Sequence, residues 1–243
     1  MLSLGVAGLA LLVAGCGEGV ESAAGGEAAA GPCPAALTAG QLTDATELGS
    51  ADVDGDGSND DVAMGAVPGG GADCAVAVVV TTAEQTYAAP VAGATEAVGE
   101  QALAEPTFAQ IDGMGGDEVV VTTSWNPRGG GALSMFSYVN GELMQVTHSG
   151  TRSGEPWSVF GTVDDGGGSP ELLGCADDGM FVHATTPDPR ATASEISVYA
   201  LREGQLTKLE GVEAQGVVPE TLYVRDTYPG MPTSGLAVFD DCG

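Results

Sequence analysis

The sequence predicts an all-β protein. Short segments rich in Val, Thr and aromatic residues alternate with turn residues along most of the chain. After the first 15 residues, no segment of helical length repeats its apolar residues at a period of about 3.6. The 39 glycines and 13 prolines disfavour long helices and favour short strands joined by tight turns.

The first element is an apolar run over residues 4–14, which has the length of a signal-peptide core and is too short to cross a bilayer. It ends in Val13-Ala14-Gly15-Cys16, which resembles the lipobox of bacterial lipoproteins. The resemblance implies that residues 1–15 are a signal peptide, that the protein is exported, and that a lipid on Cys16 is its membrane contact. Residues 1–4 lack the usual Lys or Arg, and a buried apolar segment ending in a chance cysteine is the alternative.

Residues 16–32 are mostly Gly, Ala and Glu, which predicts a flexible linker after the lipidated cysteine. Residues 33–243 have the length of one β-repeat domain. The formal net charge is −28 with only six basic residues, which argues against nucleic acid as a partner because phosphate binding requires clustered Lys and Arg. The acidity fits a hydrated surface, with an acidic binding face as the alternative.

Four cysteines remain once Cys16 is assigned to the lipid, and an even number in an exported chain predicts two disulfides. Four cysteines allow three pairings. Sequence order favours Cys33 with Cys74 and Cys175 with Cys242. No pair has the C-x-x-C spacing of a zinc site.

The most specific motif is an acidic, glycine-rich loop at residues 52–60, in which carboxylates alternate with other residues. Loops of the D-x-D-G-D-G type wrap Ca²⁺, an ion that takes about six to eight oxygen ligands. The expected ligands are Asp52, Asp54, Asp56, Ser58 and Asp60. Without a cation, four carboxylates in so short a loop would repel one another.

Two other interpretations of this loop stay open. An EF-hand or dockerin-type site needs an acidic residue at position 12, where Ala63 stands, and flanking helices that the pattern does not indicate. A solvated acidic turn without a metal is the second alternative.

The acidic loop recurs in weaker form at residues 108–121 and 160–173, which indicates a repeat of about 50 to 60 residues. The second loop reads as shorter than the first, and the third lacks three of the ligands. Two strands are expected after each loop, at 74–81 and 86–91, at 132–139 and 142–147, and at 195–201 and 205–209. Asn140-Gly141 signals a hairpin between one such pair, and strands at 221–225 and 235–239 suggest an incomplete fourth unit.

These features resemble the FG-GAP and VCBS repeat families, whose integrin-alpha-type β-propellers have four-stranded blades and Ca²⁺ loops. The closest match is residues 52–68, where Asp60-Asp61-Val62-Ala63-Met64-Gly65-Ala66-Val67-Pro68 stands in place of the family pattern D-L-x-V-G-x-P. The resemblance implies a propeller-like array of about three to four antiparallel sheets, as a small or partial propeller. A sandwich of related hairpins is the alternative.

No catalytic motif is evident, since G-x-S-x-G, H-E-x-x-H and P-loop patterns are missing. We interpret His148 and His183 as ordinary strand or surface residues, and Trp125 and Trp157 as packing residues with a carbohydrate platform as the alternative. The sequence thus favours a lipid-anchored, Ca²⁺-stabilised protein at the cell envelope that binds a protein or glycan, or has a structural role, without catalysis. The alternative is a secreted acidic hydrolase directed at glycans, although no carboxylate pair is singled out.

Overall fold

The computed structural model describes residues 33–34, 37–98, 106–126, 130–162, 171–176, 180–185 and 195–210. These residues form β-strands, turns and three short 3-10 helices, η1 (Ala39–Gln41), η2 (Ala72–Cys74) and η3 (Gly150–Arg152), and they include no α-helix. The all-β prediction is therefore confirmed. The signal peptide, Cys16, the linker to residue 32, the third loop at 163–170 and the expected fourth unit lie outside the described residues.

The first sheet is a four-stranded antiparallel meander whose strands follow one another in sequence order. Its strands are β1 (Thr43–Ala51), β2 (Asp60–Ala66), β3 (Val76–Thr81) and β4 (Thr86–Pro90). Every residue of β3 from Val76 to Val80 is buried, which explains why this strand is apolar throughout and does not alternate. β1 is an edge strand, and most of its side chains are exposed.

The second sheet repeats this meander and adds one strand. It contains β5 (Thr107–Ala109), β6 (Glu118–Asn126), β7 (Gly130–Val139), β8 (Glu142–Gln145) and β10 (Ser158–Thr162). β8 pairs with the end of β7, and β10 pairs with its beginning. β1 and β5 each precede an acidic loop and pair with the strand that follows that loop. β10 precedes the third loop, but it pairs with β7 and therefore belongs to the second sheet.

The third sheet has four antiparallel strands and one parallel edge strand. Its strands are β11 (Glu171–Ala176), β12 (Met180–Thr185), β13 (Glu195–Arg202), β14 (Gln205–Lys208) and β9 (Thr147–His148), of which β9 runs parallel to β14. β12 is a strand that the sequence pattern did not reveal, because its six residues do not alternate clearly between apolar and polar.

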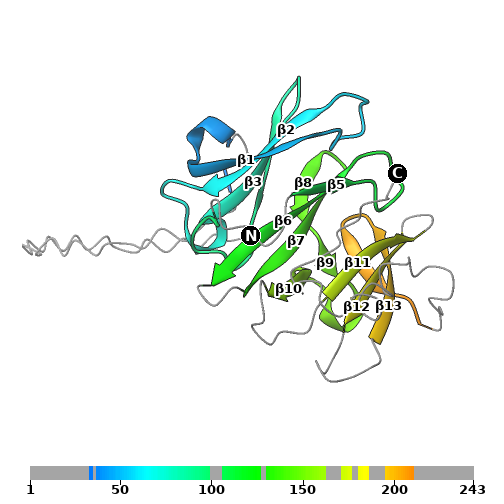
Figure 1. The fold of residues 1–243 in the computed structure, drawn as a ribbon. Coiled ribbons are helices and arrows are strands. Elements are labelled where there is room, and N and C mark those ends of the chain that lie inside the picture. Colours follow the sequence, from blue (N-terminus) through cyan, green and yellow to red (C-terminus); the bar gives the residue numbers. More distant parts are fainter. Residues whose placement is uncertain are drawn as a thin grey trace, which may run out of the picture.

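The three sheets pack in series, from the blue and cyan strands through the green strands to the yellow and orange ones (Figure 1). Successive residues of β6 point to opposite faces of the middle sheet. Val119 and Val121 join a core shared with the first sheet, whereas Val120 joins a core shared with the third. The first core includes Val53, Val62, Met64, Val78, Val80, Phe136 and Leu143, and the second includes Ile111, Leu133, Met135, Trp157, Leu201 and Leu206.

Two hairpin turns in the described chain have the two-residue geometry that suits twisted strands. Asn140 and Gly141 have φ angles of +53° and +90°, and Glu203 and Gly204 have φ angles of +50° and +71°. Both central residues of each turn thus lie in the left-handed region, as in a type I′ turn. The hairpin predicted at Asn140-Gly141 is confirmed, and the second turn joins the strands expected at 195–201 and 205–209.

The disulfide between Cys33 and Cys74 is present, with the two Cα atoms 5.3 Å apart. It ties the chain ahead of η1 to η2, just before β3, beside a small core that includes Leu42 and Val79. Cys175 lies on β11, and Cys242 lies outside the described residues. The second disulfide therefore stays a prediction.

Within the described ranges, no strand pairing joins the third sheet back to the first. The sheets therefore form an open series in this part of the chain. None of these residues belongs to a helix long and apolar enough to cross a membrane.

Candidate metal centre

The acidic loop connects two neighbouring strands of the first sheet. Asp52 follows the last residue of β1, and Asp60 is the first residue of β2. Gly55 and Gly57 have φ angles of +76° and +88°, a left-handed conformation that glycine adopts without a clash of a side chain. The chain can therefore curl within a few residues and bring both ends of the loop close together.

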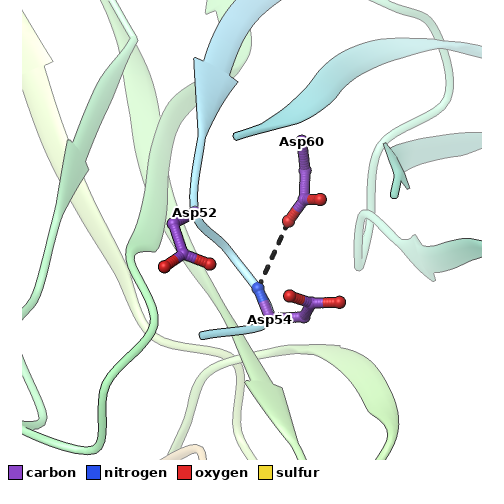
Figure 2. Close-up of side chains that lie close together, drawn as sticks. All are labelled: Asp52, Asp54 and Asp60. Carbon is purple, nitrogen blue, oxygen red and sulfur yellow. Dashed lines mark hydrogen bonds between the residues drawn. The ribbon is translucent and has the colours of Figure 1, made fainter. Parts of the chain in front are cut away.

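Carboxylate oxygens of Asp52, Asp54 and Asp60 lie within 4.8 Å of one another. Figure 2 shows these side chains around the turn, with Asp60 reaching from the start of β2 to the main-chain nitrogen of Asp54. Asp60 is only 1% exposed, and Asp52 and Asp54 are partly buried. This group of oxygen atoms can hold a metal ion.

Hydrogen bonds from main-chain N–H groups fix the orientation of these carboxylates. Asp60 Oδ2 accepts from the nitrogens of Val53 and Asp54, at 3.0 and 3.3 Å. Asp54 Oδ1 accepts from the nitrogen of Asp56 at 3.2 Å. Asp52 Oδ2 accepts from the nitrogen of Gly57 at 2.9 Å. The loop thus holds its carboxylates in place through its own main chain.

One carboxylate oxygen of Asp52 has no protein partner in the described chain. Asp52 Oδ1 is buried, and in the described part of the chain no group donates a hydrogen bond to it. A buried carboxylate oxygen without a partner is unfavourable, and a bound cation would satisfy it. The residues present therefore fit a metal ion.

The pKa of Asp60 is raised above its usual value, mainly by burial. The charges of Asp54 and Asp56 add to the rise. The N–H groups of Val53 and Asp54 oppose it. A divalent cation would remove the repulsion and favour the ionised form of all the carboxylates.

Two of the expected ligands lie outside the group of three. Asp56 and Ser58 are exposed, and Asp56 Oδ1 accepts a hydrogen bond of 2.7 Å from the Ser58 nitrogen. The structure thus brings together Asp52, Asp54 and Asp60 of the five residues selected from the motif.

The loop between β5 and β6 repeats the hydrogen bonding of the first loop. Glu118 is the first residue of β6, and its Oε2 accepts from the nitrogens of Ile111 and Asp112 at 2.7 and 3.2 Å. Asp112 Oδ1 accepts from the nitrogen of Met114 at 2.7 Å. Glu118 therefore occupies the place of Asp60 in the first loop.

The expectation that the second loop is shorter is wrong, because both loops have eight residues between their strands. Gln110 stands in place of Asp52, and Met114 in place of Asp56. These two replacements hide the equivalence from a search for alternating carboxylates. The spacing from Asp112-Gly113 to Glu118 is the sequence signal that could have revealed it.

Glu118 is the most perturbed carboxyl group of the second loop. It is 2% exposed, and its Oε1 also accepts from Ser137 Oγ at 3.0 Å. Burial raises the pKa of Glu118 to about 7, and the charge of Asp112 contributes to the rise. Met114 is 73% exposed and contributes no carboxylate. The described residues form no second group of three clustered metal ligands.

A cavity of about 220 Å³ lies between the two loops and two hairpin turns. It is lined by Val53, Asp54, Asp112, Met114, Gly116, Glu118, Tyr138, Val139, Asn140 and Glu203. Sequence reasoning did not identify this cavity, because the residues come from four separate segments. Its walls combine acidic side chains with apolar ones.

The remaining functional candidates from the sequence are not gathered at this cavity. His148 is buried on β9, and Trp157 is 1% exposed in the core between the second and third sheets. Trp157 is therefore a packing residue and cannot form a carbohydrate platform. Trp125 lies on β6 and His183 on β12.

Comparison with known proteins yields no relative for this chain. No protein-family description, curated protein or solved structure matches it.

Proposed function

We propose that residues 52–60 bind Ca²⁺ and that the ion joins the end of β1 to the start of β2. The observation that carries this proposal is the group of Asp52, Asp54 and Asp60 carboxylates within 4.8 Å. An all-oxygen group suits a hard cation such as Ca²⁺ better than a transition metal. Asp56 and the carbonyl of Ser58 complete the ligand set that the motif spacing predicts.

The role of the ion is structural. The ligands sit where two strands meet, and hydrogen bonds from the loop main chain hold the oxygens of Asp52, Asp54 and Asp60. A bound cation relieves their mutual repulsion and fixes the ends of both strands. The binding free energy then adds to the free energy of unfolding.

We further propose that the domain is a propeller-like array of repeats. Supporting this proposal, the two four-stranded meanders place equivalent loops before β2 and β6, with Asp60 and Glu118 in corresponding positions. The resemblance of the first loop to FG-GAP and VCBS repeats points the same way.

The proposed location is outside the cytoplasm, with the chain anchored to the membrane by a lipid on Cys16. The Cys33–Cys74 disulfide supports this location, because disulfides persist in oxidising compartments. In that setting the domain binds a protein or a glycan, or has a structural role in the envelope, without catalysis. The low number of basic residues argues against nucleic acid as the partner.

Thermal unfolding in Ca²⁺ and in chelator tests the metal site. Saturating Ca²⁺ at about 100 times its dissociation constant adds about 2.7 kcal/mol, which raises the melting temperature of a domain of this size by about 5 to 10 °C. Asp54→Asn/Asp56→Asn is expected to lose most of this rise, because the double variant removes two of the proposed ligands.

The matched control is Asp73→Asn/Glu84→Gln, which removes the same number of charges from exposed positions outside the loop. This control is expected to keep the full Ca²⁺-dependent rise. If the melting temperature of the wild type is the same in Ca²⁺ and in chelator, the loop is a solvated acidic turn without a metal, and the proposed calcium site is wrong.

One observation favours the hydrolase alternative. Glu118 and Asp112 line the cavity, and a carboxyl group with a pKa of about 7 is suited to act as a general acid. However, Glu118 already accepts three hydrogen bonds, from Ile111, Asp112 and Ser137. These bonds give its side chain a structural role in the second loop. Hydrolysis in a glycan panel that Glu118→Gln abolishes, with the folded state intact, would establish the alternative.

A further inference from the structure

The two equivalent loops touch each other through main-chain atoms. The nitrogen of Asp117 in the second loop donates a 2.7 Å hydrogen bond to the carbonyl oxygen of Asp52 in the first. A Cβ atom on Gly55 would lie 2.5 Å from the Gly115 oxygen, and one on Gly116 would overlap the oxygen of Val53. The main chains therefore approach so closely that only glycine fits at these two positions.

Asp52 takes part both in the proposed cation site, through its side chain, and in the contact with the second loop, through its carbonyl oxygen. Its side chain is part of the proposed cation site, and its Oδ1 atom is buried without a partner in the described chain. Its carbonyl oxygen receives the Asp117 N–H. Whatever fixes the Asp52 side chain also fixes the main-chain atom to which the second loop is bonded.

Charge makes the contact depend on what the first loop binds. Asp52 and Asp117, the two residues that make this contact, each carry a carboxylate. The like charges of these two side chains oppose the approach of the loops. A cation beside Asp52 would offset this repulsion.

The contact also joins loops that belong to two different hydrophobic cores. Val53 of the first loop belongs to the core shared by the first and second sheets, whereas Ile111 of the second loop belongs to the core shared by the second and third. Both loops line the cavity, through Val53 and Asp54 on one side and Asp112, Met114 and Gly116 on the other.

We infer that Ca²⁺ bound at Asp52, Asp54 and Asp60 orders the second loop through the contact between the Asp52 carbonyl and the Asp117 amide. This inference rests on the proposed calcium site and extends it to residues that do not ligate the ion. Gly116 and Asp117 are then positioning residues, which transmit occupancy of the first loop to the second loop and to the cavity wall that it forms.

Hydrogen exchange of the full chain with and without Ca²⁺, read by mass spectrometry, tests the inference. In the wild type, Ca²⁺ is expected to slow exchange at residues 52–60 and, by about tenfold or more, at 110–118. A tenfold change corresponds to about 1.4 kcal/mol. Residues 195–210 in the third sheet serve as an internal reference and should change little.

Gly116→Ala separates the contact from the metal site. Gly116 needs no left-handed conformation, so its added Cβ acts through overlap with the Val53 oxygen alone. Calorimetric titration of this variant should still show Ca²⁺ binding, while the added protection stays confined to residues 52–60. Gly40→Ala, where a Cβ would meet nothing within 4 Å, should behave as the wild type.

The possible outcomes distinguish the two proposals. If titration shows no Ca²⁺ binding to the wild type, both the calcium site and the coupling fail. If Ca²⁺ binds and protects only residues 52–60, the calcium site stands and the coupling is overturned. Equal protection of residues 110–118 and 195–210 would indicate global stabilisation and would also overturn the coupling, and this comparison needs no variant to fold.

Discussion

At the scale of single residues, the buried carboxyl groups of Asp60 and Glu118 occupy equivalent positions but differ in how their negative charge can be neutralised. Asp60 and Glu118 each begin a strand, each is almost fully buried, and each accepts two N–H groups of the preceding loop. Asp60 belongs to a group of three carboxylates that a cation can neutralise. Glu118 has no such group around it, so burial and the charge of Asp112 raise its pKa to about 7 and favour protonation instead.

The raised pKa of Glu118 predicts a pH dependence of stability. The folded state binds this proton more tightly than the unfolded chain, so the stabilisation is complete below the usual pKa of 4.5 and is lost as the pH rises through about 7. Glu118→Gln stays neutral, so its free energy of unfolding should rise relative to the wild type by about 3 kcal/mol between pH 4.5 and pH 8. Urea unfolding in chelator at several pH values measures this difference.

The control for this measurement is Glu142→Gln, which changes an exposed residue of the same type in β8. Its pH profile should run parallel to that of the wild type. Parallel profiles for Glu118→Gln as well would show that Glu118 does not titrate in the folded state near neutral pH.

At the scale of elements, local pattern located β3, β4, β7, β8, β13 and β14 to within two residues at each end. β4, β13 and β14 match the expected segments closely, and both type I′ turns have glycine as their second central residue, which adopts φ above zero without a side-chain clash. β12 was missed, because its residues lack clear alternation. The second acidic loop was misjudged, because its likeness to the first lies in hydrogen bonds and not in residue types.

Gly65 in β2 tests how tightly the first sheet packs. Its Cβ would lie 2.9 Å from Leu42 Cβ and 3.0 Å from both Ala45 Cα and the Thr43 oxygen. Gly65→Ala is therefore expected to destabilise the fold by about 1 to 3 kcal/mol, as overpacking does. Gly40→Ala meets no neighbouring atom and should be neutral or stabilising by up to about 1 kcal/mol.

Urea unfolding of both alanine variants checks this prediction. Equal free energies of unfolding for Gly65→Ala and Gly40→Ala would mean that β1 moves aside at little cost. That result would show β1, an exposed edge strand, to be loosely attached along this part of its length.

At the scale of the whole molecule, the middle sheet organises the described chain. Alternate residues of β6 enter two different cores, so the second sheet is covered on both faces. A phenolic hydrogen bond of 2.9 Å between Tyr87 of β4 and Tyr138 of β7 adds a polar link between the first and second sheets. The Cys33–Cys74 disulfide fastens the beginning of the domain to this assembly.

Removing this disulfide should destabilise the domain as a whole. The bond closes a loop with a sequence separation of 41, which corresponds to about 4 kcal/mol of lost chain entropy in the unfolded state. Cys33→Ala/Cys74→Ala should lower the free energy of unfolding by roughly this amount, measured in urea without reductant. Adding reductant to the variant then measures what the remaining cysteines contribute, and an unchanged midpoint in the variant would contradict the prediction.

The sequence by itself determined the all-β class, several strand positions, the two tight turns and the carboxylates at Asp52, Asp54 and Asp60, and it favoured the Cys33–Cys74 pairing among three possible ones. These features depend on residues near in sequence, or on a small set of possible pairings. Tertiary structure alone decided that β10 joins the second sheet, that β9 runs beside β14, and that Asp52 contacts Asp117. Such contacts depend on how distant segments bury their apolar faces together, and no local pattern of residues encodes that choice.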